Sequence, residues 1–286
     1  MSTQQINQNA HITFIGGGNM GRALISGLLA NGFKAHQLSV VEANTSTGLQ
    51  LSQDFGVEII GTVDQITFDF SKTNVVVMAI KPQDFSVVAK SLSEKLEHAK
   101  DSGPLILSIA AGIRLKDMSR WLGYERCVRA MPNTPALIGK GITGLFADTA
   151  VNTSDRTLAE TICNAVGQAV WVNEEKLIDA VTAVSGSGPA YVFAFLEAMQ
   201  SSGEKLGLDA ATARKLAYAT LEGATQLANN SNEHAGVLRE RVTSKGGTTA
   251  AALDILKQLD WHGALEKAID AASQRSKTMG DELGKN

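Results

Sequence analysis

A glycine-rich hexapeptide near the start of the chain has the spacing of a dinucleotide site. Residues 16–21 read Gly-Gly-Gly-Asn-Met-Gly, with an apolar run of strand length before them and an apolar helical segment after them. The first and third glycines permit a tight turn and a close approach of the backbone to a pyrophosphate. The last glycine lets helix and strand pack closely, and the helix N-terminus offers unpaired N–H groups to phosphate. A glycine-rich turn needed only for packing is the alternative. The cofactor-binding residues predicted here are Gly16, Gly18, Asn19, Met20 and Gly21.

An acidic residue ends the next apolar run. The carboxylate of Glu42 could accept hydrogen bonds from both hydroxyls of a ribose and would repel a 2′-phosphate, which favours NADH. The polar residues 44–47 follow and could hydrogen-bond a 2′-phosphate, although this loop holds no Arg or Lys to neutralise it. The sequence therefore places Glu42 in the cofactor site and leaves the choice between NADH and NADPH open.

Later apolar runs end in residues that would face the same crevice, because ligands of open α/β sheets bind beyond the carboxyl ends of the strands. Lys81 follows one such run and could reach the ribose or the pyrophosphate; a lysine exposed on a loop is the alternative. Small residues at 110–112 would let a nicotinamide ring lie flat against the backbone, and Asn133 could orient its carboxamide. The cofactor-binding residues predicted at these ends are Ala79, Lys81, Pro82, Ala110, Ala111 and Asn133.

Two segments of small residues open helical stretches in the second half of the chain. Residues 184–191 read Val-Ser-Gly-Ser-Gly-Pro-Ala-Tyr, and residues 242–249 read Val-Thr-Ser-Lys-Gly-Gly-Thr-Thr. Hydroxyl groups and free backbone N–H groups at the positive end of a helix can hold a carboxylate. From the residues alone, a carboxylate site and a pair of ordinary helix N-caps are equally good interpretations.

The composition of the 286-residue chain argues against several classes of protein. The net charge is −3 and only 19% of the residues are charged, so the clustered basic residues that neutralise nucleic-acid phosphates are lacking. No apolar run approaches the roughly 18 to 20 residues of a membrane span, and residues 1–10 are polar, without the regions of a signal peptide. We expect a cytoplasmic protein that binds neither nucleic acid nor membrane.

Neither the cysteines nor the histidines have the spacing of a metal or redox site, and no metal is predicted. Cys127 and Cys163 are expected to be small buried apolar residues, and the five histidines to be structural or solvated. The motifs supply Gly, Ser and Thr rather than a His–carboxylate pair or a nucleophile with its base. The chemistry of this chain is therefore expected to depend on the positioning of a substrate more than on a strong acid.

The elements that must position these residues follow from the apolar pattern. Apolar runs separated by helical segments predict a parallel sheet covered on both faces, the doubly wound α/β arrangement of Rossmann domains. The predicted strands are residues 12–15, 38–42, 75–80, 105–109, 127–131, 142–147 and 169–172, with a helix at 155–165 before the last.

From about residue 174 the chain is Ala-rich, with helical spacing and short breaks. The predicted helices are residues 177–184, 190–206, 209–229, 233–242, 249–259 and 263–279. We predict a Rossmann-type α/β domain over residues 1–172 and an all-α domain over residues 173–286. The second domain should dimerise, because its apolar helices exceed what one small bundle can cover.

In their order along the chain, these motifs resemble the pyrroline-5-carboxylate reductase family. The family's signature has two small hydroxyl-type residues, a variable residue, two glycines, a variable residue and Thr, which residues 243–249 match. The matching segments span nearly the whole chain and are residues 16–21, 79–82, 108–112, 133–135, 185–191 and 242–253.

The resemblance implies an enzyme that transfers a hydride from NADPH or NADH to the C=N carbon of Δ1-pyrroline-5-carboxylate and gives L-proline. It implies a Rossmann domain that binds the cofactor and a helical domain that dimerises by interleaving its helices; larger rings of dimers, up to decamers, are common in the family. The matched loop would hold the substrate carboxylate, with Thr249 beside the ring nitrogen as the catalytic residue. The substrate-binding residues implied are Ser244, Gly246, Gly247, Thr248 and Thr249.

Two other functions remain as alternatives. A hydroxyacid dehydrogenase with the same two-domain plan would need a base such as a lysine from the helical domain, and residues 185–191 contain no Lys or His. A regulatory protein that senses a nucleotide would keep residues 16–21 but would not need Thr249 and the glycines before it. Oxidation of NADH or NADPH in the presence of pyrroline-5-carboxylate distinguishes all three functions.

Overall fold

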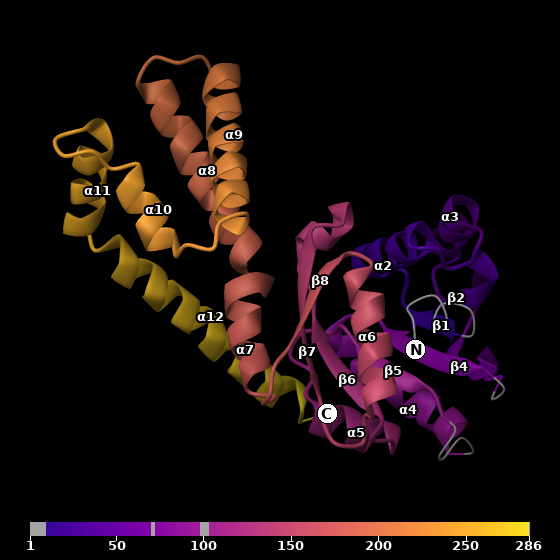
Figure 1. Ribbon diagram of the computed structural model, residues 1–286. Coiled ribbons are helices and arrows are strands. Elements are labelled where there is room, and N and C mark those ends of the chain that lie inside the picture. The colour runs from indigo at the N-terminus through magenta and orange to yellow at the C-terminus, as the bar shows by residue number, and fades with distance from the viewer. Residues whose placement is uncertain (1–9, 70–71, 98–102, 286) are drawn as a thin grey trace. The chain divides into compact units, whose positions relative to one another are not determined.

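A single eight-stranded sheet, with the strand order β3-β2-β1-β4-β5-β6-β7-β8, dominates the first part of the chain (Figure 1). The computed structural model describes residues 10–69, 72–97 and 103–285. The strands are β1 (Ala10–Ile15), β2 (Leu38–Val41), β3 (Glu58–Ile60), β4 (Thr73–Met78), β5 (Leu105–Ser108), β6 (Cys127–Met131), β7 (Gly141–Ala147) and β8 (Gly167–Trp171). Neighbouring strands pair in parallel except β6 and β7, which pair antiparallel.

The helices fall between the strands and then fill the second half of the chain. They are α2 (Asn19–Ala30), α3 (Thr45–Phe55), α4 (Phe85–Leu96), α5 (Leu115–Leu122), α6 (Thr153–Asn164), α7 (Leu177–Val181), α8 (Gly188–Lys205), α9 (Ala210–Asn229), α10 (Ala235–Arg241), α11 (Thr248–Gln258) and α12 (Trp261–Leu283). None of the helices in the described ranges is long and apolar enough to cross a membrane.

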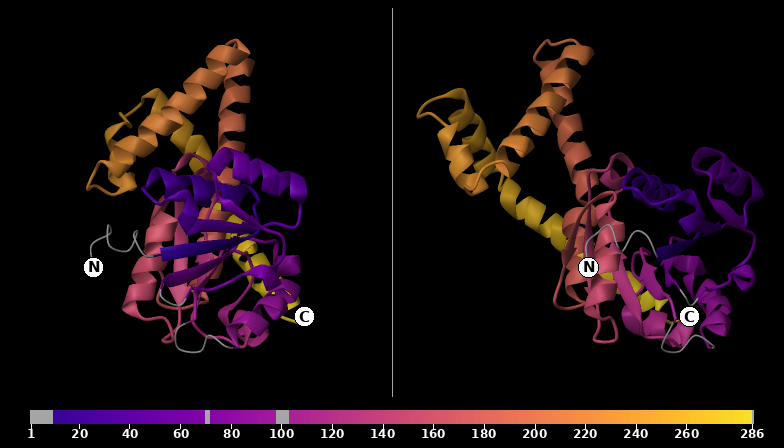
Figure 2. Two further views of the ribbon diagram at one scale, coloured as in Figure 1. Left: turned by 90° about the vertical axis from the view of Figure 1, so that its right-hand side faces the viewer. Right: turned by 45° about the vertical axis from the view of Figure 1, so that its right-hand side comes forward.

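Alternate residues of each central strand enter two separate cores, one on each face of the sheet. Ile12 and Phe14 of β1 pack with α2 and α6 on one face. Val76 and Met78 of β4 pack with α4 and α5 on the other. Figure 2 shows helices on both sides of the strands. The predicted doubly wound α/β domain is therefore confirmed.

Two features of the sheet differ from the predicted one. β3 was not predicted, because it has three residues and only half-buried or exposed side chains, so it lacks a strong apolar signal. The strand at β7 was predicted, but it runs antiparallel to β6. The link between them, residues 132–140, contains only a 3-10 helix (Thr134–Ile138) and is too short for the crossover of a dozen or more residues that a parallel pair requires.

The described chain divides into two compact units. The first comprises Met1–Ser187 with Ala272–Asn286, and the second comprises Gly188–Ala271. The second unit is wholly helical and contains α8 to α11 and the beginning of α12, so the predicted all-α character is confirmed. Helix α12 begins in the second unit and ends in the first. The sequence-based boundary between residues 172 and 173 stays a prediction.

The expected helix at 177–184 is interrupted in the structure. Helix α7 ends at Val181 and continues as a π-helical turn, Thr182–Gly186, in which the N–H of Ser187 donates to the carbonyl of Thr182 at 2.8 Å. Gly186 packs closely here, since a Cβ on it would lie 2.7 Å from Cε of Met131. The turn therefore lies against the carboxyl end of β6.

Both cysteines are buried and unpaired, as the sequence predicted. Burial raises the pKa of the Cys127 thiol to about 12, and it raises that of Cys163 to about 12 as well. Neither thiol is therefore a thiolate at physiological pH.

Candidate functional site

The glycine-rich turn after β1 contains two glycines that the protein's own packing requires. Gly16 has φ +97°, and a Cβ on it would lie 2.6 Å from the carbonyl oxygen of Ala79. A Cβ on Gly21 would lie 2.8 Å from the carbonyl oxygen of Gly16. Any side chain at these positions would push the turn away from β4 or from α2.

Gly18 differs from its neighbours because nothing in the described protein explains its lack of a side chain. Its backbone is extended, with φ −68° and ψ −177°, and a Cβ on it would meet no atom within 4 Å. Gly18 is also the N-cap of α2, and no side chain caps this helix. The first-turn N–H groups, which include those of Asn19 and Met20, are therefore free for an anion. This arrangement fits a pyrophosphate over Gly18.

Glu42 is bound to the glycine-rich turn rather than projecting freely from the sheet. Its Oε2 accepts the N–H of Gly17 at 3.0 Å, and its Oε1 accepts the N–H of Asn44 at 2.9 Å. These two bonds fix the carboxylate between the turn and the start of α3. Each oxygen keeps a second lone pair, so the predicted acceptance from ribose hydroxyls is compatible with this geometry and stays a prediction.

Hydrogen bonds beyond the strands align the carboxyl ends of β1, β4 and β5. The N–H of Ala79 donates to the carbonyl of Ile15 at 2.8 Å, and the N–H of Ile109 donates to the carbonyl of Met78 at 3.2 Å. The glycine-rich turn, the segment 79–82 and the turn 110–112 are therefore brought to one edge of the sheet. The order of these strands reverses direction between β1 and β4, which is where open α/β sheets bind their ligands.

The two charged or polar residues predicted near this edge differ in their partners. Lys81 is exposed, and its side chain has no ion pair or hydrogen bond within the described part of the chain. Asn133 is buried: its Nδ2 donates to the carbonyl of Ser185 at 3.1 Å, and its Oδ1 accepts the N–H of Ile142 at 2.9 Å. Asn133 therefore joins β6 to the π-helical turn and to β7, and one amide hydrogen remains for a carboxamide.

The loop matching the family signature opens α11 in the second unit. Gly246 has φ +72°, and the N–H of Gly247 donates to the carbonyl of Ser244 at 3.0 Å. A Cβ on Gly247 would lie 2.5 Å from Oγ of Ser244, so this tight turn requires glycine. Gly247 is the N-cap of α11, which has no side-chain cap. The first-turn N–H groups beside Thr248 and Thr249 are thus available to a carboxylate.

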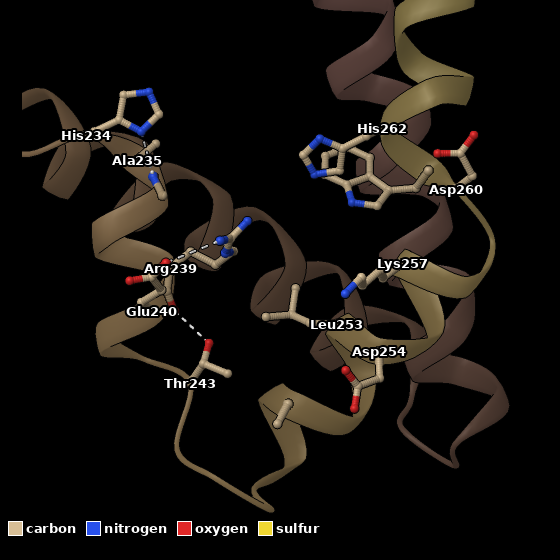
Figure 3. Close-up of a pocket in the computed structure, with 13 residues that line it drawn as sticks. His234, Ala235, Arg239, Glu240, Thr243, Leu253, Asp254, Lys257, Asp260 and His262 are labelled. Atoms are coloured by element: carbon tan, nitrogen blue, oxygen red, sulfur yellow. Dashed lines mark hydrogen bonds and ion pairs between the residues drawn. The ribbon is translucent and has the colours of Figure 1, made fainter.

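The second unit contains a cavity of about 810 Å³ that was not predicted from the sequence (Figure 3). Side chains of α10, α11 and the start of α12 line it, and Thr243 and Ala250 connect it to the signature loop. His234 caps α10, since its Nδ1 accepts the N–H of Gly236 at 3.1 Å. His262 packs edge-on against Trp261 with ring centroids 4.5 Å apart. Both histidines therefore have structural contacts.

One polar group of the second unit has no partner. The hydroxyl of Tyr191 in α8 is buried without a hydrogen bond to any described residue.

Within residues 10–69, 72–97 and 103–285, no three His, Cys, Asp or Glu side chains are grouped to hold a metal ion.

Comparison with protein families gives two matches that together cover most of the chain. Residues 175–279 match the model described as pyrroline-5-carboxylate reductase dimerisation. Residues 11–112 match the model described as NADP oxidoreductase, coenzyme F420-dependent.

Curated relatives and solved structures agree with these matches. The chain is 41% identical to the pyrroline-5-carboxylate reductase of Pseudomonas aeruginosa over 274 residues, 96% of this chain and 98% of the relative. It is 34% identical to that of Pisum sativum, over 93% of this chain and 94% of the relative. The structure of a pyrroline-5-carboxylate reductase from Coxiella burnetii superposes with a TM-score of 0.87 at 37% identity, covering 95% of this chain and 99% of that one. The Plasmodium falciparum pyrroline carboxylate reductase with NADP bound gives 0.81 at 28% identity, covering 96% and 99%.

Proposed function

The chain belongs to the pyrroline-5-carboxylate reductase family, and on this premise we propose that it reduces Δ1-pyrroline-5-carboxylate to L-proline with NADPH or NADH. The observation that carries the proposal is the full-length similarity, together with family matches that include both the cofactor turn and the signature loop. The bound cofactor supplies the hydride from C4 of its nicotinamide. A cofactor of either kind fits the open space over Gly18 and the uncapped start of α2.

The residues of the first unit bind and orient the cofactor in this proposal. The pyrophosphate is held by the turn that contains Gly16, Gly18 and Gly21 and by the N–H groups of Asn19 and Met20. Glu42 faces a ribose. Support comes from the alignment of the strand ends, which brings the other predicted cofactor residues to the same edge. These are Ala79, Lys81, Pro82, Ala110, Ala111 and Asn133.

The signature loop of the second unit binds the substrate in this proposal. The N–H groups at the start of α11 and the hydroxyls of Ser244 and Thr248 hold the carboxylate, and Thr249 lies beside the ring nitrogen. Gly246 permits the positive φ of this loop and Gly247 its tight turn, and neither has a side chain that would keep a ligand from the backbone. An imine accepts a hydride once its nitrogen is protonated, so the hydroxyl of Thr249 needs only to orient the nitrogen or pass a proton to it.

We propose that the protein forms a homodimer through the second unit and that these dimers assemble into rings of up to a decamer. We also propose that the protein is located in the cytoplasm. The exposed apolar side chains of the second unit support the dimer. Among them are Phe193 at 62%, Leu206 at 88% and Leu259 at 72% exposure, which an isolated chain would leave in water. Native mass measurement and cell fractionation test the ring and the location.

Steady-state oxidation of NADPH and of NADH with pyrroline-5-carboxylate tests the proposed activity. Turnover that yields L-proline is expected with at least one of the two cofactors. A hydroxy acid with the oxidised cofactor is the comparison reaction, since a hydroxyacid dehydrogenase would use it. Absence of turnover with both reduced cofactors would contradict the proposal.

A further inference from the structure

The turn 110–112, proposed to lie under the nicotinamide, is covered by the last turns of the chain's final helix. Gly112 has φ +76°, and a Cβ on it would lie 3.0 Å from Cδ1 of Leu283 and 3.0 Å from Cε of Met279. The turn's own hydrogen bond, from the N–H of Ala110 to Oγ of Ser108, is long at 3.3 Å. Its position therefore depends on the groups packed around it.

Arg114, two residues beyond this turn, binds the same end of α12. Its Nη1 pairs with Oδ1 of Asp281 at 2.7 Å, and its Nη2 donates to the carbonyl of Lys277 at 2.9 Å. The guanidinium lies flat over Gly280, where a Cβ would come within 2.8 Å of Nε. The Arg114 side chain thus contacts both a carboxylate and a backbone carbonyl of α12. These two contacts fix the orientation of the guanidinium more strictly than a single ion pair would.

A network around the buried Arg129, Asp179 and Ser276 holds the segment that follows the turn. Oε1 of Glu175 accepts the N–H of Leu115 at 2.7 Å and lies 3.1 Å from Nη1 of the buried Arg129. Oδ1 of Asp179 accepts the hydroxyl of the buried Ser276 at 2.7 Å. The beginning of α5 is therefore bound to β6 through Glu175, and α7 is bound to α12 through Asp179.

We propose that Arg114 is a positioning residue for the nicotinamide. By fixing the turn 110–112 against the end of α12, it sets the height and tilt of the surface on which the ring lies. An error of about 1 Å in the placement of reacting groups can lower the rate by roughly a hundredfold, so a small shift of this turn has a large kinetic effect. The inference rests on the proposed function, in which Ala110 and Ala111 of this turn bind the cofactor and the nicotinamide lies against them.

Ligands that differ only in the nicotinamide separate this role from general stability. The intact chain is titrated with NADPH and with 2′-phospho-ADP-ribose, and with NADH and ADP-ribose, for the wild type, Arg114→Ala and the control Arg275→Ala. Arg275 lies on the same helix and pairs with Glu282 at 2.9 Å, on the exposed surface. The expected result for Arg114→Ala is a dissociation constant raised by about threefold to tenfold for the dinucleotide and unchanged for the fragment. Arg275→Ala should leave both unchanged.

The kinetic readout is the Michaelis constant of each substrate. Arg114→Ala should raise the KM of the cofactor and lower kcat while leaving the KM of pyrroline-5-carboxylate within about twofold. Arg114→Lys keeps a positive charge for Asp281 but loses the second N–H group that reaches the carbonyl of Lys277. We expect its dissociation and Michaelis constants to lie between those of the wild type and Arg114→Ala. Arg114→Lys also replaces Arg114→Ala in these experiments if the alanine variant does not fold.

Equal weakening of dinucleotide and fragment, or no weakening of either, would overturn the proposal. The binding experiment needs no substrate. A chain that binds NADPH with the expected pattern but does not reduce pyrroline-5-carboxylate would contradict the proposed function and leave the role of Arg114 intact.

Discussion

Neighbouring glycines of the cofactor turn are required for different reasons, and substitution should separate them. Gly18→Val has room in the protein, so it should fold with wild-type stability while its side chain crowds the pyrophosphate. We expect NADPH and NADH to bind at least about tenfold more weakly, or ~1.4 kcal/mol. Gly16→Ala should instead lower the free energy of unfolding by about 2–4 kcal/mol, since it adds a clash and a disfavoured φ. Calorimetric titration and urea unfolding measure the two effects; wild-type cofactor affinity in Gly18→Val would contradict this account.

Substitution of Thr249 tests the proposed role of the signature loop in substrate binding. Removing its hydroxyl in Thr249→Ala should lower kcat/KM by about one to three powers of ten, the order expected for loss of an orienting or proton-donating group. Thr249→Ser should retain most of the activity. Thr161→Ala is a matched control, because that hydroxyl lies on α6 and only donates to the carbonyl of Thr157. Unchanged kinetics in Thr249→Ala would remove this residue from the site.

His11 should contribute to the dependence of stability on pH. Its pKa is lowered from the ordinary value of 6.5, first by burial and then by the nearby Lys72, so the folded chain favours the neutral ring. Its contribution to stability is therefore complete above about pH 6.5 and is lost as the pH falls toward the lower folded-state pKa. In urea unfolding at pH 8 and pH 5, His11→Gln should lose less stability between the two pH values than the wild type. An equal loss would show that His11 does not titrate in this way.

At this scale, sequence reasoning identified residue types better than their contacts. The spacing of residues 16–21 predicted the turn. At Gly16 a positive φ and close packing leave only glycine, and at Gly21 close packing does so. The hydrogen bonds of Glu42 to Gly17 and of Asn133 to Ser185 could not be predicted from the sequence, because each joins residues far apart in the chain. Such pairs depend on the register of strands that the sequence does not specify.

Among the elements, helix α6 shows how an ion pair with a buried carboxylate joins a helix to the residue before β6. Asp155 in its first turn is only 3% exposed in its side chain and receives two hydrogen bonds from Arg126, at 2.7 and 2.5 Å. Asp155→Ala would leave the guanidinium without its carboxylate. We expect the free energy of unfolding to fall by about 2–4 kcal/mol. Glu282→Ala removes one partner of an exposed pair, so it should change the free energy of unfolding much less. Equal losses in the two variants would contradict the difference in burial.

The strands of the central sheet could be predicted from the sequence because each is a short apolar run bounded by turn residues. The direction of β7 was missed. An apolar run has the same composition in either direction, and the signal was the short connection between the two predicted strands, which favours an antiparallel pair. The π-helical turn after α7 was also missed. Gly186 in this turn packs against Met131, a contact between segments far apart in the chain that helical periodicity does not indicate.

On the scale of the whole molecule, the helical unit is incomplete as a single chain. Its exposed apolar side chains predict a dimer at micromolar concentration, measured by light scattering. Leu206, just after α8, is 88% exposed, and Leu206→Glu tests whether this side chain is buried in the dimer. An unchanged mass would place the dimer contact elsewhere on the second unit. A monomeric wild type would contradict the dimer itself.

The change from strands to helices predicted the two-part plan, because composition differs along the chain. The return of α12 to the first unit was not predicted. Arg114 and Asp281 are 167 positions apart, and nothing local in either segment indicates that they meet. Contacts of this kind come from packing, and only the structure reveals them.

The transfer of the hydride itself is the most direct test of the proposed reaction. The wild-type chain is incubated with pyrroline-5-carboxylate and with NADPH or NADH carrying deuterium at both C4 positions, and the L-proline formed is analysed by mass spectrometry. We predict one deuterium per molecule, on the ring carbon that was double-bonded to nitrogen. Proline without deuterium, or no proline with either cofactor, would contradict the account.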